Sequence, residues 1–223
     1  DGSGFKTFLH DFNDSTSIPF NGIAYLFEDF DGRLWIRSYS EFTIYDPVLE
    51  RFSSPGKNYR GTDIPIAGLQ SLFTDSKNNT WLVDSNYGLY QFNPANQTVD
   101  SIPFVSKIDK PDYDNSLSDI SEDSKHMIWV VSKAGELLQI NPETKQTEHT
   151  YFLGDEVLDE YNNFQLFIDS DNDIWIYSPG IPYGVFFFDH QTKKISRYTQ
   201  SSTTFTLSAN LISSVVEDNN GAI

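Results

Sequence analysis

The chain alternates short apolar runs with polar turns in the manner of an antiparallel sheet. The apolar run Ile23–Glu28 ends at the turn Asp29–Gly32, where glycine tolerates a positive φ and aspartate can accept hydrogen bonds from its own backbone. Three further strand-length runs follow, separated by tight turns: Leu34–Ser38, Phe42–Tyr45 and Arg51–Ser53. No stretch shows the helical period of about 3.6 residues. The pattern predicts a meander of four antiparallel strands.

This unit recurs along the chain with a nearly constant period. The four tryptophans stand 46, 48 and 46 residues apart, and an aspartate precedes each of them by six positions. The aligned pairs are Asp29 and Trp35, Asp75 and Trp81, Asp123 and Trp129, and Asp169 and Trp175. Four strands in a unit of this length are typical of propeller blades.

We therefore predict an all-β fold, a β-propeller fragment with about four complete four-stranded blades and partial ones, belonging to a larger propeller. The complete repeats span approximately 19–53, 66–104, 114–152 and 163–199. Residues 210–223 begin a fifth copy, whose tryptophan would fall one position beyond Ile223, and residues 1–18 would close a preceding blade. The repeated tryptophans should fill the wedges between adjacent blades, and the aspartates should form turns.

Composition excludes several classes of function. The chain has 223 residues, with 15 Lys and Arg against 32 Asp and Glu, and a net charge of −17. Such an excess of acid disfavours nucleic acid and anionic membrane surfaces as partners of this segment. The absence of cysteine removes disulfides, cysteine nucleophiles and cysteine-ligated metals. No apolar run approaches the roughly 18 residues of a membrane span.

The residues that could carry chemistry fit no catalytic or metal motif. Asp169–Asp173 opens like a calcium loop, but Ile174 and Gly180 stand where an EF-hand requires Gly and Glu. The same turn only superficially resembles the Asp-box of sialidases. The four histidines lack metal-ligand spacing, and no nucleophile elbow or phosphate-binding loop is present. The sequence thus predicts no catalytic residue, no metal site and no cofactor.

The segments 23–36 and 211–223 resemble the two-component regulator propeller repeat: an aliphatic strand, Glu-Asp, a turn with Gly, and an aliphatic residue before Trp. The resemblance extends over essentially the whole chain. It departs after the tryptophan, where the family has small residues and this chain has Arg37, Val83, Val131 and Tyr177.

This resemblance implies that the segment belongs to the periplasmic sensor domain of a hybrid two-component system. Members of that family typically carry two seven-bladed propellers, a membrane span and a cytoplasmic histidine kinase, and they sense oligosaccharides. It implies an oligosaccharide as ligand, a homodimeric parent protein anchored in the inner membrane, and no enzymatic activity in this segment. Two alternatives stay open: a propeller glycoside hydrolase or lyase, and a non-catalytic scaffold that binds another protein.

The longest linker, 54–68, is the candidate ligand site. It holds Lys57, Tyr59 and Arg60, two cations around an aromatic ring in a strongly acidic chain. A cation could hold an acidic sugar and tyrosine could stack on a pyranose. Arg37 and Tyr39, near the neighbouring turn, are secondary candidates. The alternative is that 54–68 is only a flexible surface loop.

Overall fold

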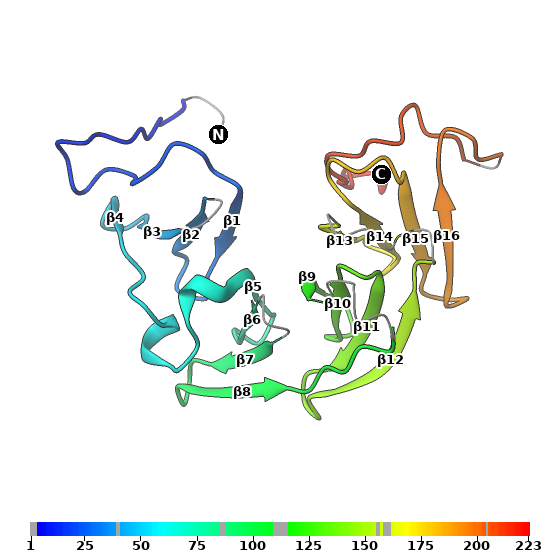
Figure 1. The fold of residues 1–223 in the computed structure, drawn as a ribbon, viewed down its shortest axis with the longest axis horizontal. Helices are drawn as coiled ribbons and strands as arrows, with labels where there is room; N and C mark the ends of the chain where they lie inside the picture. Colours follow the sequence, from blue (N-terminus) through cyan, green and yellow to red (C-terminus); the bar gives the residue numbers. More distant parts are fainter. Residues whose placement is uncertain are drawn as a thin grey trace.

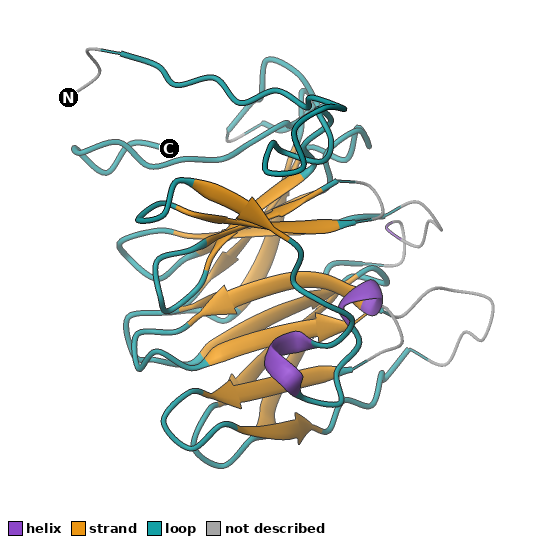
Figure 2. Cartoon of the chain, turned by 90° about the vertical axis from the view of Figure 1, so that its left-hand side faces the viewer, coloured by secondary structure: helices purple, strands orange, loops and turns teal. Residues whose placement is uncertain are grey.

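The structure is a computed structural model that describes residues 4–38, 41–84, 88–108, 116–154, 157, 162–203 and 205–223. Within these ranges the strands form four separate antiparallel sheets, each a four-stranded meander in chain order (Figure 1). The predicted all-β fold of four-stranded propeller blades is confirmed. Two single-turn 3-10 helices lie between the first and second blades (Figure 2): η1 (Tyr59–Gly61) and η2 (Ile66–Gly68).

Each blade begins about ten residues before its tryptophan. The first contains β1 (Tyr25–Glu28), β2 (Leu34–Arg37), β3 (Phe42–Asp46) and β4 (Arg51–Ser53). The second contains β5 (Leu69–Thr74), β6 (Thr80–Asp84), β7 (Leu89–Asn93) and β8 (Thr98–Ile102). The third contains β9 (Leu117–Glu122), β10 (Ile128–Ser132), β11 (Glu136–Asn141) and β12 (Gln146–Phe152). The fourth contains β13 (Gln165–Ile168), β14 (Ile174–Tyr177), β15 (Val185–Asp189) and β16 (Lys194–Tyr198).

The first strand of every blade faces the middle of the molecule. Figure 1 shows β1, β5, β9 and β13 around the central space, with β4, β8, β12 and β16 outermost. Each inner strand contacts the inner strand of the next blade. Side chains on these four strands therefore share one axial space although they are far apart in the sequence.

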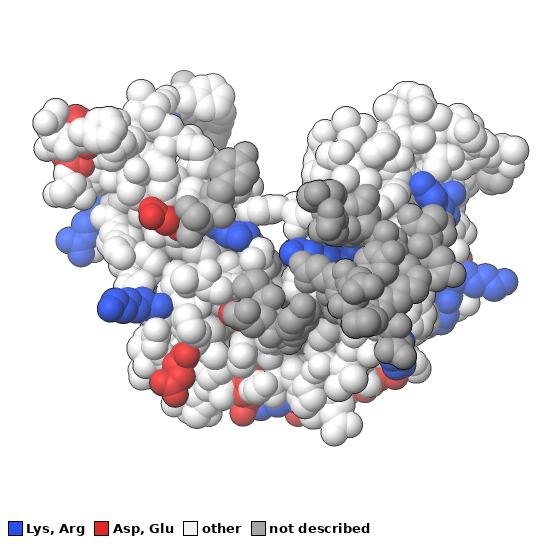
Figure 3. Space-filling model, in the orientation of Figure 1, with Lys and Arg blue, Asp and Glu red and all other residues white. Residues whose placement is uncertain are grey.

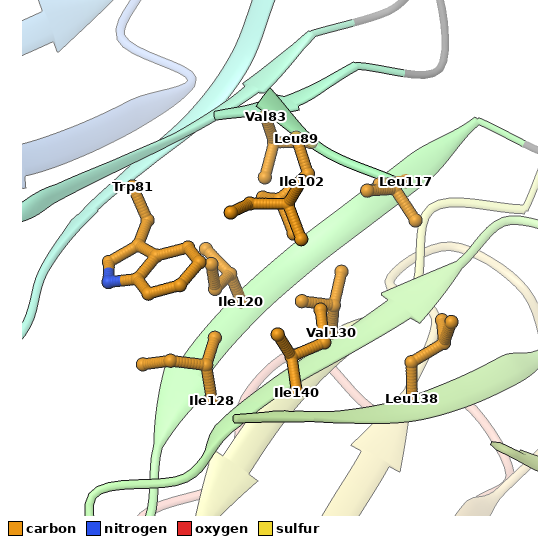
Figure 4. Close-up of a cluster of buried hydrophobic side chains, with 10 residues drawn as sticks. All are labelled: Trp81, Val83, Leu89, Ile102, Leu117, Ile120, Ile128, Val130, Leu138 and Ile140. Atoms are coloured by element: carbon orange, nitrogen blue, oxygen red, sulfur yellow. The ribbon is translucent and has the colours of Figure 1, made fainter. Parts of the chain in front are cut away.

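The tryptophans fill the wedges between blades, as predicted, in the three wedges that two complete blades enclose. Trp35, Trp81 and Trp129 are buried, each among apolar side chains of the following blade. Figure 4 shows Trp81 beside Ile120 and Ile128 of the third blade. Trp175 is only partly buried, because the described residues after β16 form no strand to cover it.

One turn geometry recurs at every aspartate of the repeat, which confirms the predicted turn role. The Oδ2 atom accepts the indole N–H of the tryptophan six residues later, at 2.8–2.9 Å, in all four blades. The Oδ1 atom accepts two backbone N–H groups of the turn, at Lys77 and Asn79 in the second blade. Asp218 repeats the Oδ1 pair with Asn220 and Ala222, so the fifth copy forms the same turn.

Polar bonds also connect neighbouring blades at these turns. Ser76 donates through its backbone N–H and its hydroxyl to the two carboxylate oxygens of Glu122 in the next blade, at 2.7 and 2.8 Å. Ser170 makes the same pair of bonds with Glu217, at 2.8 and 2.5 Å. At Glu122-Asp123 and Glu217-Asp218, the glutamate therefore binds the preceding blade and the aspartate forms the turn.

In the part of the chain that the structure describes, no helix is both long and apolar enough to cross a membrane.

Candidate ligand-binding site on the propeller axis

The linker between the first two blades folds inward. Tyr59 is fully buried. Its ring lies 5.3 Å from that of Trp35 and 5.4 Å from that of Phe92, so it belongs to the core between the two blades. Burial raises the pKa of its hydroxyl. In this position the ring has no face left for a sugar.

Arg60 turns toward the first blade. Its guanidinium donates to Asp29 Oδ2 at 2.7 Å and to Asp31 Oδ2 at 2.9 Å, and it lies 4.3 Å from the centre of the Phe30 ring. Asp29 Oδ2 also accepts the indole N–H of Trp35, so Arg60 offsets the charge of a buried turn carboxylate. Lys57 is exposed on the same linker, and its backbone carbonyl accepts the Ile66 N–H at 2.9 Å.

Arg37 lies apart from these residues. It ends β2 opposite Tyr25, whereas Asp29 precedes the start of β2, so Arg37 and Arg60 lie at opposite ends of this strand. A four-residue strand is about 10 Å long. Tyr39 lies outside the described residues. The four described candidates therefore do not form one site, and only Arg37 borders the propeller axis.

A cavity of about 190 Å³ lies on the axis beside Arg37. One repeat position, ten residues before each tryptophan, contributes a side chain to its wall from every blade: Tyr25, Ser71, Asp119 and Gln165. Residues on either side of this position complete the wall: Phe27, Gln70, Ser118 and Asn163. The cavity adjoins a wider hollow of about 1030 Å³, which shares Tyr25, Arg37, Gln70, Asn163 and Gln165 and extends to Pro179 and Gly180.

Hydrogen bonds link the walls of the cavity across the blades. Asn163 Nδ2 donates to the hydroxyl oxygen of Tyr25, and Ser118 Oγ donates to Asn163 Oδ1 at 3.2 Å. Tyr177 donates its hydroxyl to Gln165 Oε1 at 3.0 Å. Three of the four blades thus support a network of neutral donors and acceptors that faces open space.

Asp119 is the carboxylate of this cavity. Its Oδ2 accepts the backbone N–H of Leu166 in the next blade at 2.9 Å. Burial raises its pKa to about 6, although the N–H groups of Leu166 and Ile120 act in the opposite direction. A carboxyl group with such a pKa can exchange between acceptor and donor near neutral pH.

Arg37 provides the positive charge of the cavity. It donates from Nη1 to the Gln70 carbonyl oxygen at 3.0 Å and from Nη2 to Gln70 Oε1 at 3.2 Å. Its guanidinium carbon lies 5.7 Å from the centre of the Tyr25 ring and 5.8 Å from that of Phe42. Burial lowers its pKa. The cavity therefore combines an aromatic wall, amides, hydroxyls, one carboxyl and one guanidinium, the set of groups that binds polyhydroxylated molecules.

Sequence reasoning singled out Arg37 but missed the other members of the cavity. A signal was present, because the position ten residues before the tryptophan holds a polar or hydroxyl-bearing residue in all four blades, directly before the aliphatic residue of the repeat. Its identity changes from blade to blade, which hides it from a search for repeated residues.

A second hollow, of about 700 Å³, lies toward the opposite end of the inner strands. Its lining includes Leu26, Leu72 and Ile120, and the carboxylate of Asp29 there is already bound to its turn. Glu28, Thr74 and Asn78 also line this hollow, and it shares Ser71 and Asp119 with the axial cavity.

No known protein family and no curated protein matches the sequence. Solved structures do match. One is an extracellular domain described as that of a hybrid two component system, BT3049 from B. thetaiotaomicron, with a TM-score of 0.66, 16% identity, and 97% of this chain and 27% of that one covered. Another is the extracellular domain of BT4673 from B. thetaiotaomicron, with a TM-score of 0.64, 17% identity, and 93% and 26% covered.

A streptogramin B lyase has a TM-score of 0.56 at 16% identity, with 82% of this chain and 56% of that chain covered. Of the two extracellular domains from B. thetaiotaomicron, by contrast, the chain spans only about a quarter of the length. At these identities the likeness establishes the fold that the chain shares with them.

Proposed function

We propose that this chain is part of the extracytoplasmic sensor domain of a two-component system and binds an oligosaccharide in the axial cavity without converting it. The observation that carries the proposal is the single repeat position that places Tyr25, Ser71, Asp119 and Gln165 around one cavity. Blade architecture alone does not require polar side chains there, since the same strands could present aliphatic residues to one another.

The likeness to extracellular domains of two component systems supports the sensing role and the extracytoplasmic location. In this proposal the chain occupies the periplasm, and the parent protein is a homodimer anchored in the inner membrane. Its histidine kinase lies outside this segment. Ligand binding would reach the kinase through the rest of the ectodomain.

The chemistry of the cavity favours binding over turnover. Glycoside hydrolases of the common types use two carboxyl groups on either side of the scissile bond. Among the described residues that line the axial cavity and the wider hollow beside it, Asp119 is the single carboxylate. Amides and hydroxyls predominate, and such groups hold sugar hydroxyls in place.

The proposal is tested with the full-length protein, by calorimetry against a panel of neutral, uronate-containing and sulfated oligosaccharides. Each bound sugar is recovered and its products are analysed. The variants Asn163→Ala and Gln165→Ala remove amides from the cavity and should weaken binding by roughly ten- to a hundredfold each. The matched control Gln191→Ala removes an exposed amide at the β15–β16 turn, and its affinity should equal that of the wild type.

The outcomes separate three kinds of protein. Binding without product formation, lost in the cavity variants, supports the sensor. Turnover of a sugar would overturn it in favour of a hydrolase or lyase, the class that the streptogramin B lyase fold represents. If no glycan bound, the scaffold alternative would replace it.

A further inference from the structure

Arg37 is a half-buried cation that has only neutral partners among the described residues. Its guanidinium donates two hydrogen bonds to Gln70, one to the carbonyl oxygen and one to the side-chain amide oxygen. By contrast, Arg33 and Arg60 each pair with the carboxylates of Asp29 and Asp31. In the described part of the chain no carboxylate lies within ion-pair distance of Arg37.

This arrangement is unusual in a chain with a net charge of −17, where acidic side chains are available almost everywhere. Removing a guanidinium from water is costly when no anion compensates it. Burial indeed lowers the pKa of Arg37. A half-buried guanidinium without an ion-pair partner among the described residues, at the wall of a cavity, can bind an anionic group of a ligand.

The surroundings leave room for such a charge. Figure 3 shows Lys and Arg atoms on both sides of the central hollow, while most of the visible Asp and Glu atoms lie toward the rim. A guanidinium has five N–H donors, and Gln70 accounts for two of them in the described residues, which leaves three for a ligand. Asp119, on the same wall, is bound to the Leu166 N–H and makes no ion pair with Arg37.

We infer that the ligand carries an anionic group, a sugar carboxylate or sulfate, that pairs with Arg37 in the axial cavity. The inference rests on the proposed function and specifies its ligand class. The planar fork of arginine matches a carboxylate or a sulfate with two parallel hydrogen bonds. Gln70 holds the guanidinium in position from the neighbouring blade, and the rings of Tyr25 and Phe42 flank it.

The decisive variant is Gln70→Glu. Glutamate keeps the side-chain shape of Gln70 and its acceptor oxygen next to Arg37. It adds a carboxylate that would form an ion pair with the guanidinium inside the protein. Affinity for an anionic oligosaccharide should fall by roughly tenfold or more, while the melting temperature stays equal or rises. A purely structural role of Arg37 predicts no loss of binding in this variant.

Two further variants complete the test in the full-length protein. Arg37→Gln should lower affinity for anionic sugars by roughly ten- to a hundredfold. The matched control Arg51→Gln removes an exposed arginine on β4, and affinity should stay unchanged. Oligogalacturonate and a sulfated oligosaccharide serve as separate probes, which distinguishes a carboxylate from a sulfate, and a neutral oligosaccharide serves as reference.

The results distinguish this inference from the proposed function. Anionic probes that bind to wild type and are lost in Gln70→Glu and Arg37→Gln support both. In the contrary case, neutral oligosaccharides bind with an affinity equal to or higher than that of the anionic probes, and Gln70→Glu leaves this affinity unchanged. That result would overturn the inference of an anionic group at Arg37 and would leave the proposed sensor function standing. If neither probe class binds to the folded wild type, the proposed function and this inference are both overturned.

Discussion

Asn163 donates a hydrogen bond to the hydroxyl of Tyr25, although 138 residues separate the two. Tyr25 begins the inner strand of the first blade, and Asn163 lies just before the inner strand of the fourth. The bond therefore connects the two ends of the four-blade array across the axis. It also fixes the tyrosine ring beside Arg37, on the wall of the cavity.

Tyr25→Phe removes this hydrogen bond and keeps the ring. We expect a loss of about 1 kcal/mol in the free energy of unfolding, the usual contribution of one such bond. The control is Tyr45→Phe, in a tyrosine whose ring packs on Phe8 and Phe52 at the outer side of the first blade. Urea unfolding of both variants measures the difference, and equal losses would show that the cross-axis bond contributes nothing.

Asp75→Ala tests the recurring turn. The variant loses the bond to the Trp81 indole and two bonds to backbone N–H groups, all at a buried carboxylate. We expect a loss of roughly 2–4 kcal/mol in unfolding free energy, because buried donors are left without acceptors. Asp46→Ala serves as the comparison, since the carboxylate of Asp46 also accepts two backbone N–H groups of a turn, from Val48 and Leu49, but at a site that is not buried. Its cost should be about 1 kcal/mol or less. A comparable cost at both positions would assign the stabilisation to the turn alone.

Asp119 makes stability depend on pH. Its folded pKa of about 6 exceeds the ordinary value of 3.8, so the folded state binds the proton more tightly than the unfolded state. The stability that the protonated carboxyl contributes is complete below the ordinary pKa and is lost as the pH rises through the folded one. Asp119→Asn should therefore be more stable than wild type by about 3 kcal/mol near pH 8 and equal to it near pH 3. Thermal melts across this range check the prediction, and a constant difference would exclude Asp119 as its source.

Arg60→Ala separates the linker from the ligand site. The variant removes the cation next to Asp29, a buried carboxylate, so unfolding free energy should fall by roughly 1–3 kcal/mol. Affinity for an oligosaccharide that binds at the axis should not change. Lys57→Gln, on the same linker but exposed, should alter neither quantity. A loss of affinity without a loss of stability in either variant would show that the ligand binds at the linker.

The recurring architecture could be predicted from the sequence because every blade uses the same residue types for the same two purposes, a tryptophan between blades and an aspartate in the turn. Trp81 and Asp75 are visible as columns since both the wedge and the turn require a fixed geometry. The ligand cavity is different. Its four positions hold Tyr25, Ser71, Asp119 and Gln165, one per blade, and a binding site needs different groups at each of them.

The linker shows the opposite difficulty. Lys57, Tyr59 and Arg60 suggest a binding loop when only their charge and aromatic character are considered. The partners that occupy them lie elsewhere in the sequence: Trp35 and Phe92 enclose Tyr59, and Asp29 pairs with Arg60. Contacts over such separations cannot be read from local composition. Only the fold brings the acidic turn and the basic linker together.

The burial of each tryptophan by the following blade gives the array a direction. Trp35 depends on the second blade, Trp81 on the third and Trp129 on the fourth, so a blade that opens exposes the core of its predecessor. Local unfolding would then spread toward the N-terminus, because the opening of one blade exposes the tryptophan of the blade before it. A molecule bound in the axial cavity would contact all four blades at once, so it would oppose the opening of each of them.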